Sequence, residues 1–330
     1  MSALMKRWQS LTANPGLAAS GVSLLLTLLL AGAGAAAYPG FGATQVMLNL
    51  LIDNAYLLVI AVGMSFVILS GGIDLSVGAV MALATMVCAW LLQVAQWPAP
   101  LVIALVLLGG LLFGALQGWL IHAFRLQAFI VTLAGLFLAR GLCFLISVDS
   151  ITIDAPLFVQ LSQTQWALPG LDAWLSPAAV FALLLLGAAV LVAQRSTFGR
   201  TVYAIGGNEA SALMMGLAVA RTKVAVYSLS GFCAALGGLL FALYMLSGYG
   251  QHGQGAELDA IAAVVIGGTL LSGGQGFVAG ALTGVLLLGL IQTLIAFDGT
   301  LSSWWTRIVI GALLFLFCLV QRLLARRAGA

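Results

Sequence analysis

Charged residues are scarce in this chain: Asp, Glu, Lys and Arg make up 6% of its 330 residues, against about 25% in soluble domains. With so few charges the chain cannot form a water-soluble surface, so lipid must cover most of it. Hydrophobic residues reach 63% and lie in continuous runs of about 20, the length of a transmembrane helix, whereas barrel strands alternate over about 10 residues. The composition therefore predicts an all-α polytopic membrane protein.

Lysine and histidine are rarer still, and this scarcity excludes several chemistries. Neither lysine, Lys6 or Lys223, follows a glycine, so no G-x-x-x-x-G-K-[ST] phosphate loop exists. His122 and His252 belong to no H-E-x-x-H, and the four cysteines form no C-x-x-C, which argues against metal or disulfide sites. No basic patch with interleaved aromatics suggests nucleic acid. We therefore expect no enzyme: no catalytic residues, no metal ligands and no ATPase site.

Apolar segments divide the chain into about ten expected transmembrane helices, eight at the fewest, several of them broken by glycine-rich stretches. They lie at 17–37, 46–69, 77–94, 101–121, 128–148, 174–194, 224–247, 257–271, 277–297 and 301–321. The first follows Lys6 and Arg7 and is rich in small residues, as a signal peptide would be. Its length favours an uncleaved helix.

Basic residues predict the orientation. An even number of spans puts ten of the twelve Lys and Arg on the side of both termini: Lys6, Arg7, Arg125, Arg195, Arg200, Arg221, Lys223, Arg322, Arg326 and Arg327. Because basic residues are retained in the cytoplasm, both termini are expected to be cytoplasmic. Residues 1–330 then form a single membrane domain, with one long outer loop at about 149–173 and one cytoplasmic loop at about 195–223.

The stretch SGGIDLSVG (70–78) interrupts an apolar segment with two glycines and a carboxylate. Glycine is unfavourable inside a helix and permits positive φ, so the helix should break there. Asp74 then has two interpretations that are compatible with each other. Its carboxylate can cap the next helix, or it can border a polar path, because broken helices at membrane depth line cavities or pack within protein.

Other polar side chains also lie within or beside the spans. Together they look more like a lining that binds hydroxyl groups than a relay of carboxylates, although some can simply hold helices together. The residues predicted to line a path are Asp53, Asn54, Asp74, Ser76, Phe129, Thr132, Arg140 and Gln292. Trp304 and Trp305 fit an aromatic belt at the outer interface, with stacking on a sugar as the alternative.

The cytoplasmic loop predicts a short amphipathic helix. Asn208 is a good N-cap, Glu209 suits a first turn and Gly216 a helix stop. Four apolar residues recur at helical spacing: Ala210, Leu213, Met214 and Leu217. Such a helix either lies on the lipid surface or docks in the groove of a partner.

Four motifs, in order, resemble the ribose-type permeases of bacterial ABC sugar importers. They are VILSGGIDLSVG (67–78), LQAFIVTLAG (126–135), VYAIGGNEASALMMG (202–216) and VVIGGTLLSGGQG (264–276). The resemblance extends from about residue 40 to 321. Within the family, DGTLSSWWTRIVIG (298–311) and GAELDAIAAVVIGGTLLSGG (255–274) look most like the permeases of galactofuranose importers.

The resemblance implies a multi-pass protein of the bacterial inner membrane that moves a monosaccharide, galactofuranose by the closer match. It implies a second permease, as a heterodimer, a cytoplasmic ATP-binding subunit that uses ATP and Mg²⁺, and a periplasmic sugar-binding protein that lands on loop 149–173. This chain would bind no cofactor. Residues of segment 202–216 would dock the ATPase: Asn208, Glu209, Ala210, Leu213, Met214 and Gly216. The alternative is a stand-alone, ion-coupled sugar transporter that uses Asp53 and Asp74.

Overall fold

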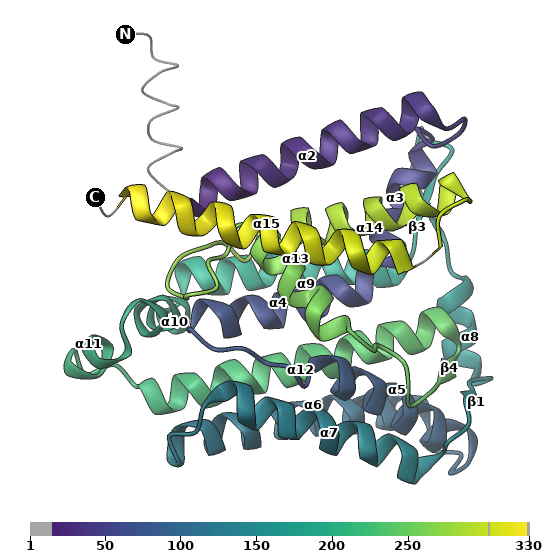
Figure 1. The fold of residues 1–330 in the computed structure, drawn as a ribbon. Coiled ribbons are helices and arrows are strands. Elements are labelled where there is room, and N and C mark those ends of the chain that lie inside the picture. The colour runs from purple at the N-terminus through teal and green to yellow at the C-terminus, as the bar shows by residue number, and fades with distance from the viewer. Residues whose placement is uncertain (1–14, 303, 329–330) are drawn as a thin grey trace, which may run out of the picture.

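The computed structural model describes residues 15–302 and 304–328, and these are helical almost throughout (Figure 1). The helices are α2 (Pro15–Ala37), α3 (Thr44–Asp53), α4 (Ala55–Leu69), α5 (Val77–Gln93), α6 (Ala99–Ala123), α7 (Ala128–Ile146), α8 (Pro156–Gln163), α9 (Pro177–Arg195), α10 (Thr197–Gly207), α11 (Glu209–Met214), α12 (Val219–Met245), α13 (Ala256–Ile266), α14 (Gly280–Asp298) and α15 (Trp304–Ala328). Four two-residue strands form antiparallel pairs: β1 (Ile151–Thr152) with β4 (Ser247–Gly248), and β2 (Trp166–Ala167) with β3 (Trp174–Leu175).

Six helices of the described chain are long and apolar enough to cross a membrane: α2, α6, α7, α9, α12 and α14. α3 and α4 meet at a bend of 53°, and together they are long and apolar enough for a seventh crossing if the bent pair is one span. α5 and α15 add shorter apolar helices. The polytopic, all-helical class is therefore confirmed. Lys6 and Arg7, which contributed to the predicted orientation, lie outside the described residues.

The predicted span 257–271 does not reach its expected length. α13 has 11 residues, which extend about 16 Å at 1.5 Å per residue, whereas the hydrocarbon core of a bilayer is about 30 Å thick. The helix ends at Ile266 because Gly267 and Gly268 follow, and Gly268 has a φ of 100° that other residues rarely adopt. α13 is therefore half a span, followed by a non-helical segment that leads to α14.

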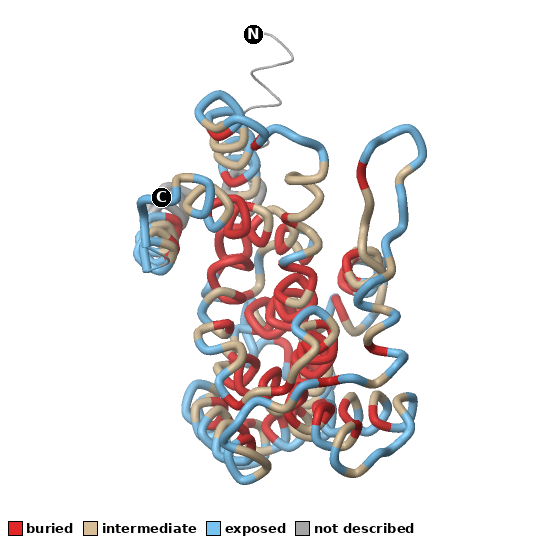
Figure 2. The backbone as a smooth tube through the Cα atoms, turned by 90° about the vertical axis from the view of Figure 1, so that its right-hand side faces the viewer, coloured by how far each residue is buried: buried red, intermediate tan, exposed pale blue. Residues whose placement is uncertain are grey.

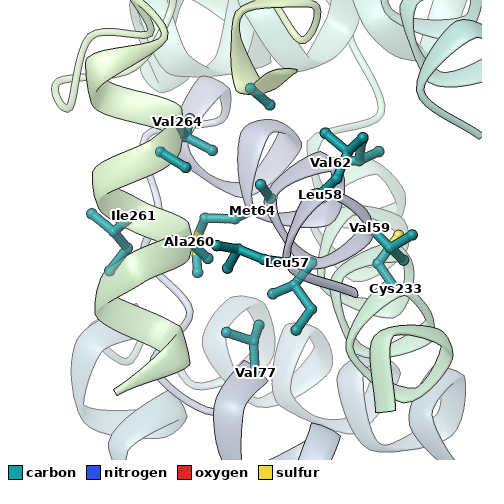
Figure 3. Close-up of a cluster of buried hydrophobic side chains, with 14 of the residues drawn as sticks. Leu57, Leu58, Val59, Val62, Met64, Val77, Cys233, Ala260, Ile261 and Val264 are labelled. Carbon is teal, nitrogen blue, oxygen red and sulfur yellow. The ribbon is translucent and has the colours of Figure 1, made fainter. Parts of the chain in front are cut away.

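The core of the bundle is α4, a helix in which every residue except Tyr56 is buried. A helix that is apolar on all sides needs protein, not solvent, around it. Figure 3 shows α4 between α13 and α12, with Leu57, Leu58 and Met64 among the packed side chains and Cys233 on α12 beside them.

Glycines on α6 let this helix approach α12 closely, as their four-residue spacing predicts. A Cβ on Gly110 would overlap the carbonyl oxygen of Gly231, and a Cβ on Gly114 would overlap that of Tyr227. Gly118 packs against the same helix one turn further on. These glycines therefore serve helix packing, because no other side chain fits between the two backbones.

The two ends of the bundle carry different structures (Figure 1). The start of α2, the end of α15, and α10 with α11 lie at one end, and α8, β1 and β4 lie at the other. From the distribution of basic residues we call the first the inner end and the second the outer end. The loop predicted at 195–223 contains α10, α11 and the first residues of α12, which begins earlier than the predicted residue 224.

Buried residues occupy the middle of the bundle (Figure 2). Large apolar side chains nevertheless point outward from its outer helices, including Leu112 on α6, Phe137 on α7 and Leu184 on α9, which are 56%, 66% and 68% exposed. Water would not solvate so much apolar surface favourably. These faces therefore suit contact with lipid or with another membrane subunit.

Candidate functional site

A break in the second span brings a carboxylate to α12. Asn54 lies at the bend between α3 and α4, and its amide nitrogen donates to the carbonyl oxygen of Leu50 at 3.0 Å. A side chain that bonds back to the preceding turn often accompanies a bend. Asp53, the last residue of α3, accepts a hydrogen bond of 3.3 Å from the hydroxyl of Tyr244 on α12. The predicted residues Asp53 and Asn54 thus have separate roles, one in a polar contact and one in the bend.

Two arginines hold the loop 249–255, which we call the clamped loop. The Arg140 guanidinium on α7 donates to the carbonyl oxygens of Gly250 and His252 at 2.7 and 2.8 Å. Arg307 on α15 donates to the carbonyl oxygen of Gln254, in the same loop, at 2.9 Å. Burial and the nearby Arg140 charge hold the pKa of His252 below its ordinary value. The predicted residue Arg140 therefore shapes the loop that leads into α13.

Asp259, on α13, links Arg307 electrostatically to the groups around Asp53. It interacts with Arg307 on α15 and with Tyr56 on α4, and Tyr56 interacts in turn with Asp53 and Tyr244. We call the charged and hydroxyl groups of this region the outer polar cluster: Asp53, Arg140, Tyr244, Asp259 and Arg307. The cluster is assembled from five helices, and it combines hydrogen-bond donors with acceptors near the outer end.

Asp74 lies in a second, fully buried network. Its side chain is 1% exposed, and one carboxylate oxygen accepts from the backbone N–H and the hydroxyl of Ser76 at 2.9 and 2.6 Å. The other oxygen accepts from the Ser230 hydroxyl on α12 at 2.7 Å. Gln117 on α6 donates to the Ser76 hydroxyl at 3.0 Å. We call these four residues the Asp74 network.

The predicted cap at Asp74 is wrong. Ser76 is the N-cap residue of α5, and its side chain makes no capping hydrogen bond. Asp74 is two residues too early to reach the N–H groups of the helix, so its carboxylate bonds the cap residue instead. The network ties the break between α4 and α5 to α6 and α12, which satisfies the buried charge with hydrogen bonds as burial demands.

Thr132 supports the same break from α7. Its hydroxyl donates to the carbonyl of Ala128 at 2.8 Å and lies 3.4 Å from that of Ile73. The buried hydroxyl of Tyr227 lies close to Gly72 and has no hydrogen-bond partner among the described residues. The break is therefore surrounded by polar side chains on several helices, although it opens onto none of the larger cavities.

The remaining predicted path residues lie elsewhere. Phe129, in the first turn of α7, is 51% exposed and belongs neither to the outer polar cluster nor to the Asp74 network. Gln292 on α14 lines a cavity together with Asp259. Asp259 itself was missed, although an acidic residue inside the predicted span 257–271 is a signal that identifies it. Ser230 was missed because a lone serine in a long apolar helix carries no such signal.

Two cavities flank the outer polar cluster. One, of about 570 Å³, is lined mainly by aromatic and aliphatic residues of α4, α9, α12 and the outer loop, including Tyr56, Trp166, Trp174 and Phe181. The other, of about 610 Å³, lies between α13, α14 and α15 and includes Asp259. In the described part of the chain, no three His, Cys, Asp or Glu side chains are grouped so that they could hold a metal ion. The region therefore offers hydrogen bonds and aromatic surface to a ligand.

The inner end carries the predicted helix in segment 202–216. Asn208 is its N-cap, and the side-chain oxygen accepts from the backbone N–H of Ser211 at 2.8 Å, as predicted. Glu209 forms an ion pair of 2.7 Å with Lys223 on α12. The helix is only six residues long, and Met214, near its end, is 81% exposed. Ala212 is buried against α10 and α12, whereas Leu213, like Met214, is exposed and faces away from the protein.

Three glycine-containing segments meet behind this helix. Gly206 near the end of α10 packs against the end of α4, and a Cβ there would overlap the Leu69 carbonyl oxygen and the backbone nitrogen of Gly274. Those two atoms form a hydrogen bond of 2.9 Å. Gly71 lies close to Gly206 as well. We call Gly71, Gly206 and Gly274 the inner glycine contact, because it joins α10 to the break that holds Asp74.

Known proteins resemble this chain over most of its length. A family model described as "Branched-chain amino acid transport system / permease component" matches residues 46–318. The inner membrane ABC transporter permease protein YjfF of Escherichia coli (strain K12) is 50% identical over 86% of this chain and 86% of its own length. The fructose import permease protein FruG of Bifidobacterium longum (strain NCC 2705) is 41% identical, over 83% and 82%. The ribose import permease protein RbsC of Escherichia coli (strain K12) is 35% identical, over 91% and 92%.

No solved structure matches the chain. The family model alone covers well over half of the sequence, and it agrees with the polytopic helical fold and with the absence of a phosphate loop. The protein is thus a multi-pass component of the inner membrane, and it is not itself an ATPase. The chain belongs to the family of branched-chain amino acid transport system permease components, and it is a permease subunit of an ABC transporter.

Proposed function

We propose that this permease serves an importer of a monosaccharide and that the sugar is galactofuranose. One observation carries the proposal of a sugar: the relatives FruG and RbsC are named for fructose and ribose, although the family description names branched-chain amino acids. The finer choice of galactofuranose rests on segments 255–274 and 298–311, which look most like the permeases of galactofuranose importers.

In this proposal, residues 1–330 form one permease domain that pairs with a second, different permease. A periplasmic sugar-binding protein delivers the sugar to the outer end, where loop 149–173 presents the half-exposed Trp166. The sugar's hydroxyl groups then meet the outer polar cluster, whose carboxylates and guanidinium groups can exchange hydrogen bonds with them. This arrangement supports recognition of a neutral, polar molecule better than that of a large apolar one.

Force from ATP hydrolysis would enter through α10 and α11. The ATP-binding subunit docks on the exposed apolar residues of α11, and the inner glycine contact passes the movement of α10 to the end of α4. The Asp74 network lies directly after that end and ties it to α6 and α12. Docking on lipid instead of on a partner remains the alternative for α11.

The first experiment is gentle purification of the chain from its native membrane, with identification of every protein that accompanies it. We expect an ATP-binding subunit and a second permease. Uptake of labelled galactofuranose should then exceed uptake of labelled ribose in cells that make the complex, and deletion of this chain should abolish it. Sugar uptake by the chain alone, in vesicles without ATP, would overturn the proposal and favour the ion-coupled transporter.

A variant of α11 tests the docking surface directly. Met214→Glu places a charge on a side chain that is 81% exposed, so the fold should tolerate it. We expect the purified variant to melt at the wild-type temperature but to lose the ATP-binding subunit during purification. If the subunit remains bound and sugar uptake is unchanged, α11 is not the docking helix.

A further inference from the structure

The cavity between α13, α14 and α15 has an unusual lining. Its volume is about 610 Å³, which lies within the range of about 300–1,000 Å³ typical of small-molecule sites. Five lining side chains carry hydrogen-bonding groups: Asp259, Gln292, Trp304, Thr306 and Arg307. They come from three consecutive helices that contact one another in the fold, and Figure 1 shows these helices together.

Most of these groups have no hydrogen-bond partner among the residues that the structure describes. The side chains of Asp259, Gln292 and Thr306 form no hydrogen bond with any described residue. Arg307 uses one guanidinium nitrogen to hold the clamped loop, which leaves other N–H groups to donate. Asp259 and Arg307 attract each other without reaching the 4.0 Å of an ion pair. The cavity thus presents acceptors and donors that are positioned by the fold and not used by it.

We propose that this cavity binds a monosaccharide. A carboxylate, an amide and a guanidinium group each offer two atoms that can hydrogen-bond to neighbouring hydroxyl groups. One negative and one positive side chain balance each other, so a neutral polyol suits the site better than an ion. Trp304, which is 72% exposed, offers an indole face for the apolar face of a sugar ring. The inference rests on the proposed function and assigns a binding site to its cargo.

The neighbouring tryptophan separates this assignment from an aromatic belt. A belt of aromatic residues at the membrane surface would explain Trp304 and Trp305 alike, because the two are adjacent at the start of α15. Only Trp304 lines the cavity, although Trp305 is also 46% exposed. The sugar site therefore predicts different consequences for the two residues, whereas a belt predicts the same consequence for both.

Saturation-transfer NMR with D-galactose tests the site on the purified full-length chain in detergent. We expect a transfer signal for the wild type and for Trp305→Leu. Trp304→Leu and Gln292→Leu should weaken binding about five- to tenfold each, the size expected for one lost hydrogen bond or stacking contact. Thermal unfolding of each variant checks that it folds. Gln292 is an exposed side chain, so Gln292→Leu still tests the site if Trp304→Leu proves unstable. Equal signals from all four proteins, or no signal from the wild type, would overturn the assignment.

Uptake in cells that contain the whole transporter distinguishes this inference from the proposed function. If the wild type takes up sugar and Trp304→Leu raises the KM while Trp305→Leu does not, the proposed function and the sugar site are both supported. If the wild type takes up sugar and the two variants behave alike, the proposed function survives and the sugar site in this cavity does not. If the wild type takes up no sugar, the proposed function fails, and the NMR experiment alone decides whether the cavity binds one.

Discussion

Substitution of Gly206 by alanine tests how tightly α10 is joined to the core. Gly206 lies where α10 meets the end of α4 and the segment before α14. The added methyl group would overlap the Leu69 carbonyl oxygen and the Gly274 nitrogen, which are hydrogen-bonded to each other at 2.9 Å. Alanine cannot fit unless these two backbones separate, so the variant must lose the hydrogen bond or move α10.

The size of the effect follows from these two contacts. Loss of a largely buried backbone hydrogen bond costs about 1–3 kcal/mol, and an extra carbon in a packed contact costs about 1–3 kcal/mol. Gly206→Ala should therefore lower the free energy of unfolding by about 2–6 kcal/mol if the contact is rigid. Gly207→Ala is the matched control, because nothing lies within 4 Å of a Cβ at that position. Its effect should stay within about 0.5 kcal/mol.

Thermal unfolding of the purified chain in detergent measures the loss of stability. Sugar uptake by the whole transporter measures whether the contact at Gly206 is also needed for transport. We expect Gly206→Ala to melt several degrees below Gly207→Ala. If α10 transmits force to the core, Gly206→Ala should also reduce uptake more than it reduces the amount of protein in the membrane. Equal melting temperatures for the two variants would refute the close contact, and equal uptake per molecule would refute its role in transmission.

Four further variants test other contacts. The two carboxylate oxygens of Asp74 accept three buried hydrogen bonds, two from Ser76 and one from Ser230. Asp74→Asn replaces one of these oxygens with an NH₂ group that cannot accept, so it should destabilise the chain by about 1–3 kcal/mol; an unchanged melting temperature would contradict the network. Lys223→Gln breaks the partly exposed ion pair with Glu209 and should lower the free energy of unfolding by less than about 1 kcal/mol. A larger loss of stability in thermal unfolding would show that Lys223 does more than pair with Glu209. Arg140→Met removes two hydrogen bonds to the clamped loop and should speed amide exchange there by mass spectrometry; unchanged exchange would show that the loop is held otherwise. Because the pKa of His252 is lowered in the fold, its contribution to stability is present above about pH 6.5 and is lost as the pH falls below that value. His252→Gln should make the melting temperature less sensitive to acid, and identical pH profiles would argue against this.

Features that depend on neighbouring residues were predictable from the sequence. The scarcity of charge identifies a membrane protein, because insertion in lipid depends on composition more than on packing. The N-cap at Asn208 and the breaks at glycine pairs are decided within a few residues. The four-residue spacing from Gly110 to Gly118 marks the face of α6 that packs, although the sequence does not show that α12 is its partner.

Contacts between distant residues emerged only in the folded chain. The hydroxyl of Ser230 reaches Asp74 across 156 positions, and the hydroxyl of Tyr244 reaches Asp53 across 191. In lipid, every helix is apolar on most sides, so hydropathy does not indicate which helices pack together or which isolated polar residues meet.

The sequence by itself therefore determined that this chain is a multi-helix membrane protein without an ATPase site, since those properties follow from composition and from local motifs. The tertiary structure alone decided that Asp259, Gln292 and Trp304 line one cavity and that Gly206 lies against the end of α4. Each of these depends on the relative placement of helices. That placement is set by shape complementarity and hydrogen bonding over the whole bundle, which no short stretch of sequence encodes.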